Sequence, residues 1–283
     1  MNLSHKVAIV TGAGRGIGKA IALAFAGEGA DVVAVSRTIP EVEQTASEIK
    51  ARGRKALAIK ADVSNQQDVQ EMIALTLKEF GRVDILVNNA GVLGPIGPTW
   101  ENNIEEWIRT VHINLIGTFL CSRAVLPMMI EQRWGRIINL SGGGAAYGRP
   151  YFSAYASSKA ALVRFTECLA AEVKPYNITV NAIAPGLVNT RMQDEVLSAG
   201  PKAGEEALAQ ARRAKAGGGV SPDLAASLAV FLASDDSAGL TGRLISAVWD
   251  DWKSLDRKRI EDIMGKEIFT LRRIDEVFFC PKG

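Results

Sequence analysis

The sequence is poor in the side chains that most often bind metals or act as nucleophiles. Only two of its 283 residues are histidines, His5 and His112, and neither has neighbours that would complete a zinc site or a serine–histidine triad. The three cysteines, Cys121, Cys168 and Cys280, cannot all pair with one another and lack the spacing of metal ligands. We therefore expect no metal site. We expect Cys121 and Cys168, which lie in helical apolar patterns, to be small buried thiols in a reducing, cytoplasmic compartment.

Excess charge and long apolar runs are scarce as well. The formal net charge is +2, which gives no electrostatic reason to expect nucleic acid or an anionic membrane as a partner. No apolar run is expected to reach the length of a membrane span, and the first residues lead into a predicted strand without the architecture of a signal peptide. The composition, 47% hydrophobic with 27 glycines, is typical of a soluble globular protein with a sizeable core.

What the sequence does contain is a glycine-rich loop between a strand and a helix. Residues 6–10 read as a buried strand, followed at once by Thr11-Gly-Ala-Gly-Arg-Gly-Ile-Gly18 and then by a helical pattern. Glycines let the backbone turn tightly and approach a pyrophosphate, and the start of the helix supplies free amide donors. This order predicts a dinucleotide site that includes Gly12, Arg15, Gly16, Ile17 and Gly18.

The second predicted strand, residues 31–36, ends at the position that distinguishes the two nicotinamide cofactors. An acidic residue there would bind the ribose 2′-hydroxyl of NAD, whereas an arginine favours a 2′-phosphate. The residues present are Ser36 and Arg37, and Arg15 lies nearby in the glycine loop. We therefore expect a preference for NADP(H), with NAD(H) possible; the alternative is that Arg37 is only a solvated loop residue.

Helix and strand patterns alternate along the rest of the chain. Strands are predicted at residues 56–60, 83–87, 136–140, 178–183 and 244–248, and helices at residues 41–52, 66–80, 104–129, 154–173 and 223–233. Regular alternation predicts an α/β fold with a doubly wound parallel sheet and helices on both faces.

Tyr155 and Lys159 lie four residues apart in one of these helical patterns and therefore on the same face. An adjacent positive charge favours the phenolate and lowers the pKa of a tyrosine. The pair could then act as a general acid or base. Tyrosine and lysine occur at this spacing by chance in many helices, so the significance of the pair depends on the other motifs.

Six motifs in a fixed order resemble those of the short-chain dehydrogenase/reductase family. They are Thr11-Gly12…Gly16-Ile-Gly18, Asp62-Val63, Asn88-Asn-Ala-Gly91, Asn114, Tyr155…Lys159 and Pro185-Gly186…Thr190, and they cover residues 5 to about 247. The resemblance implies a single Rossmann-type domain over residues 1–247. It implies an oxidoreductase that transfers a hydride between NADP(H) and a carbonyl or secondary alcohol group of a small molecule. It also implies a homodimer or homotetramer, with the helices around 104–130 and 153–173 at one interface.

The resemblance also implies roles for individual residues. Tyr155 would be the general acid/base, and Lys159 would lower its pKa and hold the nicotinamide ribose. Asn114 would hold a water that continues a proton relay; the alternative is an amide satisfied by helix packing. Further cofactor contacts are implied for Asp62 and Val63 at the adenine, Asn89, Ala90 and Gly91 at the end of the fourth strand, and Pro185, Gly186, Val188 and Thr190 at the carboxamide.

The serine loop departs from the family pattern. The family's catalytic serine commonly lies thirteen residues before the tyrosine, and Gly142 occupies that position. Ser141 is one residue earlier, and we expect it to take the role; Ser153 or a substrate group are the alternatives. The departure also leaves open an NADP(H)-binding redox sensor or scaffold with little turnover. A sugar epimerase or dehydratase that uses bound NAD(H) is a third possibility.

The C-terminal half contains two segments with little family guidance. Residues 192–220 resemble a mobile substrate lid, with glycines 217–219 as a plausible hinge. Residues 248–283 replace the family's usual ending and include Trp249, Trp252 and Phe278-Phe279, which are too apolar for a disordered tail. We expect this extension to pack on the domain, where it would cover the substrate pocket, or on a neighbouring subunit.

Overall fold

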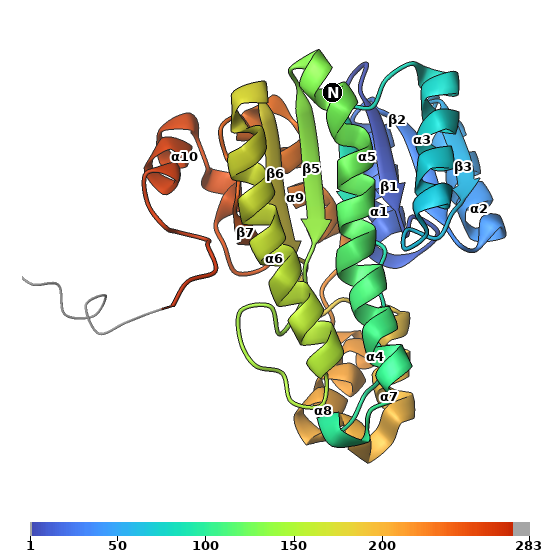
Figure 1. Cartoon of the computed structure of the whole chain (residues 1–283), viewed down its shortest axis with the longest axis vertical. Helices are drawn as coiled ribbons and strands as arrows, with labels where there is room; N and C mark the ends of the chain where they lie inside the picture. Colours follow the sequence, from blue (N-terminus) through green and yellow to red (C-terminus); the bar gives the residue numbers. More distant parts are fainter. Residues whose placement is uncertain (1, 274–283) are drawn as a thin grey trace, which may run out of the picture.

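The computed structural model of the protein describes residues 2–273, and its centre is a parallel sheet covered by helices on both faces (Figure 1). The seven strands lie in the order β3-β2-β1-β4-β5-β6-β7, and every neighbouring pair is parallel. This confirms the predicted α/β fold. The strands are β1 Val7–Thr11, β2 Asp31–Ser36, β3 Ala56–Lys60, β4 Ile85–Asn88, β5 Gly135–Leu140, β6 Ile178–Ala184 and β7 Leu244–Ser246.

The sheet packs against its helices through two large apolar cores, one on each face. One face is covered by α1 Gly16–Gly27, α2 Ile39–Lys50 and α9 Pro222–Ala233, and the other by α3 Gln66–Phe80, α5 Gly117–Gln132 and α6 Ser153–Val173. Local signals set the helix ends: Asn65 accepts hydrogen bonds from the first amides of α3, and Gly81 ends it in a left-handed conformation with φ +72°. Strands β1, β4 and β5 are buried at every residue and are mostly apolar, because both of their faces are covered.

The predicted helix over residues 104–129 is one continuous run with a change of pitch in its middle. It consists of α4 Ile104–Val111, a π-helical turn over His112–Ile116, and α5. By length and composition the run 104–132 would be apolar enough to cross a membrane, which the sequence pattern had not predicted. However, 44% of its most apolar 18-residue stretch is buried inside the fold. The α5 part packs on the sheet and on α3.

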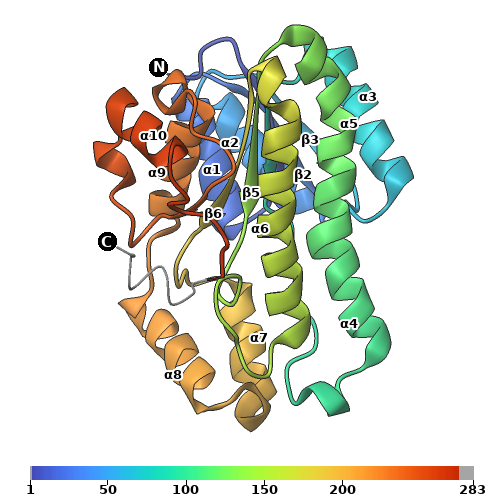
Figure 2. The same ribbon diagram turned by 60° about the vertical axis from the view of Figure 1, so that its left-hand side comes forward.

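The segment predicted as a lid, residues 192–220, lies beyond the carboxyl ends of the strands, where Figures 1 and 2 show α7 and α8 below the sheet. It contains α7 Arg191–Ala199, a short 3-10 turn over Gly200–Ala203, α8 Glu205–Arg213 and a turn over Ala214–Gly218. Within this last turn Gly217 has φ +90°, a conformation that favours glycine. Val188 and Val220 form an isolated bridge that joins the two ends of the lid.

The described part of the extension, residues 248–273, packs on its own chain. A short 3-10 helix, Trp252–Ser254, precedes α10, Arg257–Met264. Trp252 joins the core beside α9, together with Leu255, Ile260 and Ile263, whereas Trp249 is 86% exposed. The amide of Leu244, in edge strand β7, donates a 2.7 Å hydrogen bond to the carbonyl of Phe269. Phe278 and Phe279 lie outside the described residues.

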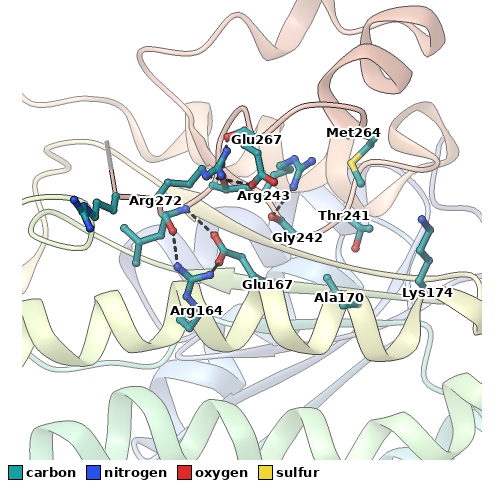
Figure 3. A pocket seen from close by; sticks show the side chains of 14 residues that line it. Arg164, Glu167, Ala170, Lys174, Thr241, Gly242, Arg243, Met264, Glu267 and Arg272 are labelled. Carbon is teal, nitrogen blue, oxygen red and sulfur yellow. Dashed lines mark hydrogen bonds and ion pairs between the residues drawn. The ribbon is translucent and has the colours of Figure 1, made fainter. Parts of the chain in front are cut away.

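Side chains of α6 and of the turn before β7 hold the extension in place, around a cavity of about 680 Å³ (Figure 3). Arg164 donates to the carbonyl of Leu271, whose amide donates to the Glu167 carboxylate. Arg243 is 9% exposed and donates to the carbonyls of Ile263 and Lys266 at 3.1 and 3.0 Å. Further 3-10 turns are Thr99–Glu101, Lys174–Tyr176 and Asp235–Ser237.

The two cysteines within helices differ in environment. Cys121 of α5 is fully buried, as expected, and burial raises the pKa of its thiol to about 12. Cys168 of α6 is exposed, so the expectation of a buried thiol is wrong at this position. It lies between Thr166 and Leu169, which point to the core, and the helical turn carries it to the outer face. Cys280 lies outside the described residues.

Candidate active site

The glycine loop after β1 is held against the loop after β4 by the amide of Asn89. Asn89 Nδ2 donates to the carbonyls of Thr11 and Gly12 at 2.9 and 3.2 Å. Gly12 has φ +64°, and a Cβ at Gly18 would lie 2.3 Å from Asn89 Nδ2. Side chains are therefore excluded at both positions, and the bare glycine backbone packs directly against Asn89.

A cavity of about 720 Å³ opens above this loop, a size typical of small-molecule sites. It extends from the ends of β2 and β3 to the start of the lid. Most of the residues predicted to bind the cofactor line it: Gly12, Arg15, Gly16, Ile17, Gly18, Ser36, Arg37, Asp62, Val63, Asn89, Ala90, Gly91 and Thr190. The bare glycine backbone, the start of α1 and the length of this cavity fit a dinucleotide.

The other predicted cofactor residues do not line this cavity. Tyr155, Lys159 and Val188 are buried, with exposed fractions of 3–6%. Gly186 is in close contact with the extension, since a Cβ there would lie 2.6 Å from Val248 Cγ2. Pro185 precedes it in the same loop after β6.

The arginines predicted to select the cofactor each face a carboxylate. Arg15 Nη1 is 2.8 Å from Glu41 Oε1, and Arg37 Nη1 is 3.8 Å from Asp62 Oδ2. Burial alone would raise the pKa of Asp62, but hydrogen bonds from Ser64 and the charge of Arg37 together lower it. Among residues 2–273, Ser36 Oγ bonds only to the backbone of Thr38. Glu41 was missed because it lies inside a helix, two elements away from the glycine loop.

Tyr155 and Lys159 lie on the same face of α6, as their spacing predicted, and both are buried. Lys159 Nζ lies 5.8 Å from the centre of the Tyr155 ring and donates a 2.7 Å hydrogen bond to the carbonyl of Leu140. Burial lowers the pKa of Lys159 to about 8. The pKa of Tyr155 is raised rather than lowered, because burial outweighs the opposing charge of Arg149.

Asn114 lies in the π-helical turn and is completely buried. Its Nδ2 donates to Ser158 Oγ at 2.9 Å and to the carbonyl of Val92 at 3.0 Å, and its Oδ1 accepts from the Val92 amide at 2.9 Å. A Cβ at Gly91 would lie 3.0 Å from Asn114 Oδ1 and 3.5 Å from Lys159 Nζ. The amide and the ammonium therefore both border Gly91, which also lines the cofactor cavity. Ser158 was not predicted, since a serine inside a helix carries no motif.

The loop from Ser141 to Phe152 places a glycine against Tyr155. A Cβ at Gly142 would lie 2.1 Å from the Tyr155 hydroxyl oxygen. Ser141 Oγ is buried and has no hydrogen-bond partner among the described residues. Ser153 Oγ accepts a 3.1 Å hydrogen bond from Trp107 Nε1. Of the three positions, it is Gly142 that faces the phenol.

Arg149, in the same loop, was also missed by sequence reasoning. Its guanidinium lies 3.9 Å above the ring of Phe152, and its charge acts on Tyr155. A lone arginine in an irregular loop belongs to no motif and has no periodicity, so only the folded loop brings it to the phenol.

Comparisons with known proteins agree with this geometry. A family model described as short chain dehydrogenase matches residues 6–200. The chain is 39% identical over 249 residues to the (2S)-[(R)-hydroxy(phenyl)methyl]succinyl-CoA dehydrogenase subunit BbsD of Thauera aromatica, covering 87% of this chain and 96% of that protein. It is 36% identical over 245 residues to the 3-oxoacyl-[acyl-carrier-protein] reductase FabG of Thermotoga maritima, covering 87% and 97%. A crystal structure of NAD+-bound xylitol dehydrogenase is 30% identical, with a TM-score of 0.81 over 87% of this chain and 98% of that one.

Proposed function

Because the chain belongs to the short-chain dehydrogenase/reductase family, we propose that it transfers a hydride between NADP(H) and the carbonyl or secondary alcohol group of a small molecule. The family's members use NAD(P)(H), and the relatives are named dehydrogenases and reductases. The observation that carries the proposal is that Asn114 and Lys159 both border Gly91. It joins the buried polar groups around Tyr155 to the wall of the cofactor cavity.

Each buried group has a part in moving one proton. When bound, the nicotinamide supplies or accepts the hydride. Tyr155 gives a proton to the substrate oxygen or takes it away. Lys159 has a pKa of about 8 and can exchange a proton near neutral pH, and Asn114 positions a water that leads the proton onward. Ser141 has an unpartnered hydroxyl among the described residues and would orient the substrate oxygen.

The preference for NADP(H) is part of this proposal. Arg37 lies at the end of β2, is about half exposed, and has only a long 3.8 Å contact to Asp62. A 2′-phosphate would offer it a stronger partner than that carboxylate contact. The competing carboxylates of Asp62 and Glu41 predict that the preference is moderate. Equal or tighter binding of NADH by the wild-type protein would contradict the preference.

We further propose that the protein works in the cytoplasm as a homodimer or homotetramer. Phe119 of α5 and Phe165 of α6 form an edge-to-face pair with ring centres 6.2 Å apart, and Phe119 is 42% exposed. An aromatic pair with one exposed ring, on two adjacent long helices, is a suitable interface centre. A particle no heavier than the 30.3 kDa chain in light scattering would contradict this assembly.

The experiment that tests the function compares wild type with Tyr155→Phe. NADPH and NADH oxidation would be followed against aliphatic ketones, quinones, keto sugars and 3-oxoacyl thioesters. We expect Tyr155→Phe to lose about 10²–10⁴-fold in kcat/KM while it still binds NADPH, because only the transferable proton is removed. Full activity of Tyr155→Phe would contradict the assigned role.

The same experiment separates the alternatives. NADPH binding without turnover on any carbonyl would favour a binding protein, for which the glycine at position 142 is the supporting observation. An epimerase or dehydratase would instead retain NAD(H) through purification and through many turnovers.

A further inference from the structure

Arg149 is a partly buried cation without a counter-ion. Its guanidinium lies over Phe152, whose ring is completely buried, and no ion pair of Arg149 is found within residues 2–273. Burial lowers the pKa of Arg149. The charges of Tyr155, Tyr147 and Glu206 raise this pKa, but by less than burial lowers it. A charge removed from water without a partner is costly, so the position is one where an anion would be bound favourably.

Two adjacent glycines lie between this cation and the Tyr155 hydroxyl. Gly142 lies against the Tyr155 hydroxyl, as its Cβ distance of 2.1 Å indicates. At the next residue, Gly143, a Cβ would lie 3.3 Å from the Tyr147 hydroxyl and 4.0 Å from Arg149 Nη1. The bare backbone of two consecutive glycines thus borders the phenol at one end and the guanidinium at the other.

On one side Tyr155 packs against apolar residues. Tyr155 and Phe152 belong to a cluster with Leu93 and with Val196 and Ala203 of the lid. The loop also contacts the lid through Tyr151, whose backbone has φ +69° and whose ring is 2.8 Å from a Cβ built at Gly204. A molecule that reaches Tyr155 from this side, beneath the lid, therefore meets apolar side chains and the Arg149 guanidinium, whereas Lys159 is already bonded to the carbonyl of Leu140.

We propose that Arg149 binds a carboxylate of the substrate, so that the enzyme acts on an oxo acid or hydroxy acid with an apolar body. The inference rests on the proposed function and names its substrate class. A guanidinium matches the two oxygens of a carboxylate with parallel hydrogen bonds. A single guanidinium, with the Glu206 carboxylate nearby, suits a monoanion better than a doubly charged phosphate.

Paired substrates test the inference. Phenylglyoxylate, 3-oxo-3-phenylpropanoate and 4-oxo-4-phenylbutanoate vary the distance from the carbonyl to the carboxylate, and their methyl esters lack the charge. We expect wild type with NADPH to favour one acid over its ester by at least about tenfold in kcat/KM, the size of one modest ionic contact. Arg149→Met should reduce that ratio to about one, mainly through KM of the acid. Any effect of the lost charge on Tyr155 is common to acid and ester and cancels in the ratio. Arg149→Lys should retain part of the preference.

The control is Arg212→Met, which removes one exposed positive charge from α8. It should leave the acid-to-ester ratio unchanged. A wild-type ratio near one, or a ratio that Arg149→Met does not alter, would overturn the inference while ester turnover leaves the proposed function intact.

A binding measurement keeps the inference testable without turnover. In calorimetry on the NADPH complex, phenylacetate should bind wild type about tenfold or more tightly than Arg149→Met, and phenylacetamide should bind both equally. Equal binding of phenylacetate to both proteins would overturn the role of Arg149. Absence of reduction of any carbonyl by wild type would instead contradict the proposed function.

Discussion

At the scale of single residues, the glycine at position 142 is part of how Tyr155 is seated. The phenol oxygen occupies the space that a side chain at position 142 would take. In the family pattern a serine stands there, so the glycine would look like a lost catalytic group from the sequence alone. The geometry gives another reason, which is that the bare backbone makes room for the hydroxyl.

Gly142→Ser is therefore expected to impair the enzyme rather than restore it. A Cβ 2.1 Å from the phenol oxygen must displace a buried ring. We expect kcat/KM to fall by about tenfold or more, measured on whichever carbonyl substrate gives the highest wild-type rate. Gly143→Ser, whose Cβ meets nothing closer than 3.3 Å, is the matched control and should change kcat/KM far less. Higher activity of Gly142→Ser would refute this account.

At the scale of elements, the extension covers the exposed edge of the sheet. An edge strand presents unpaired backbone groups, which native proteins commonly cover with a loop or helix. Here β7 is joined to Phe269 by one backbone hydrogen bond, and Arg243 binds two carbonyls near the end of α10. The apolar side of α10 is buried through Ile260 and Ile263. These contacts explain why so apolar a segment follows the last strand.

Removing the guanidinium should loosen this cover. Arg243→Met removes the guanidinium donor from the carbonyl of Lys266 and from that of Ile263, which keeps only the Lys266 amide, at a cost of about 1–3 kcal/mol in the free energy of unfolding. Urea unfolding would measure that loss, and limited proteolysis should show earlier cleavage within residues 257–273. Arg257→Met serves as control, because the Arg257 side chain is 93% exposed. An Arg243→Met protein as stable as the control would show that the contact contributes little.

At the scale of the whole molecule, the buried Lys159 links stability to pH. Burial lowers its pKa to about 8 in the folded protein, whereas the unfolded chain retains the ordinary value of about 10.4. Below pH about 8 both states carry the proton and the cost of burying the charge is complete. Between about pH 8 and 10.4 the folded state loses the proton first, so the unfolded state binds more protons and stability rises with pH.

The contribution of Lys159 can be measured by difference. Relative to Lys159→Met, the free energy of unfolding of wild type without cofactor should increase by about 1 kcal/mol from about pH 8 to about pH 9. Urea unfolding of both proteins across that range would measure it. A difference that is constant or falls with pH would mean that the ammonium is better solvated than its burial indicates.

The sequence by itself determined the architecture and the order of the cofactor motifs. Buried strands appear as short apolar runs and helices as a repeat of about 3.6 residues, so the alternation of the two could be read directly. The glycine loop, Asp62-Val63 and Asn89 to Gly91 lie at the carboxyl ends of parallel strands, which converge on one edge of a sheet. The placement of Tyr155 and Lys159 on one face of a helix followed from their spacing of four residues, which depends on the local backbone alone.

Only the tertiary structure decided what surrounds those residues. Burial reversed the expected direction of the Tyr155 pKa, because desolvation depends on every segment packed against the phenol. Three contacts bring together segments that share no sequence pattern. They are the contact of Gly142 with the Tyr155 hydroxyl, the packing of Arg149 over Phe152, and the pairing of the extension with β7. Such contacts arise from the packing of loops, whose conformations carry no periodic signal. For the same reason, the residue that we propose to select the substrate was found only in the folded chain.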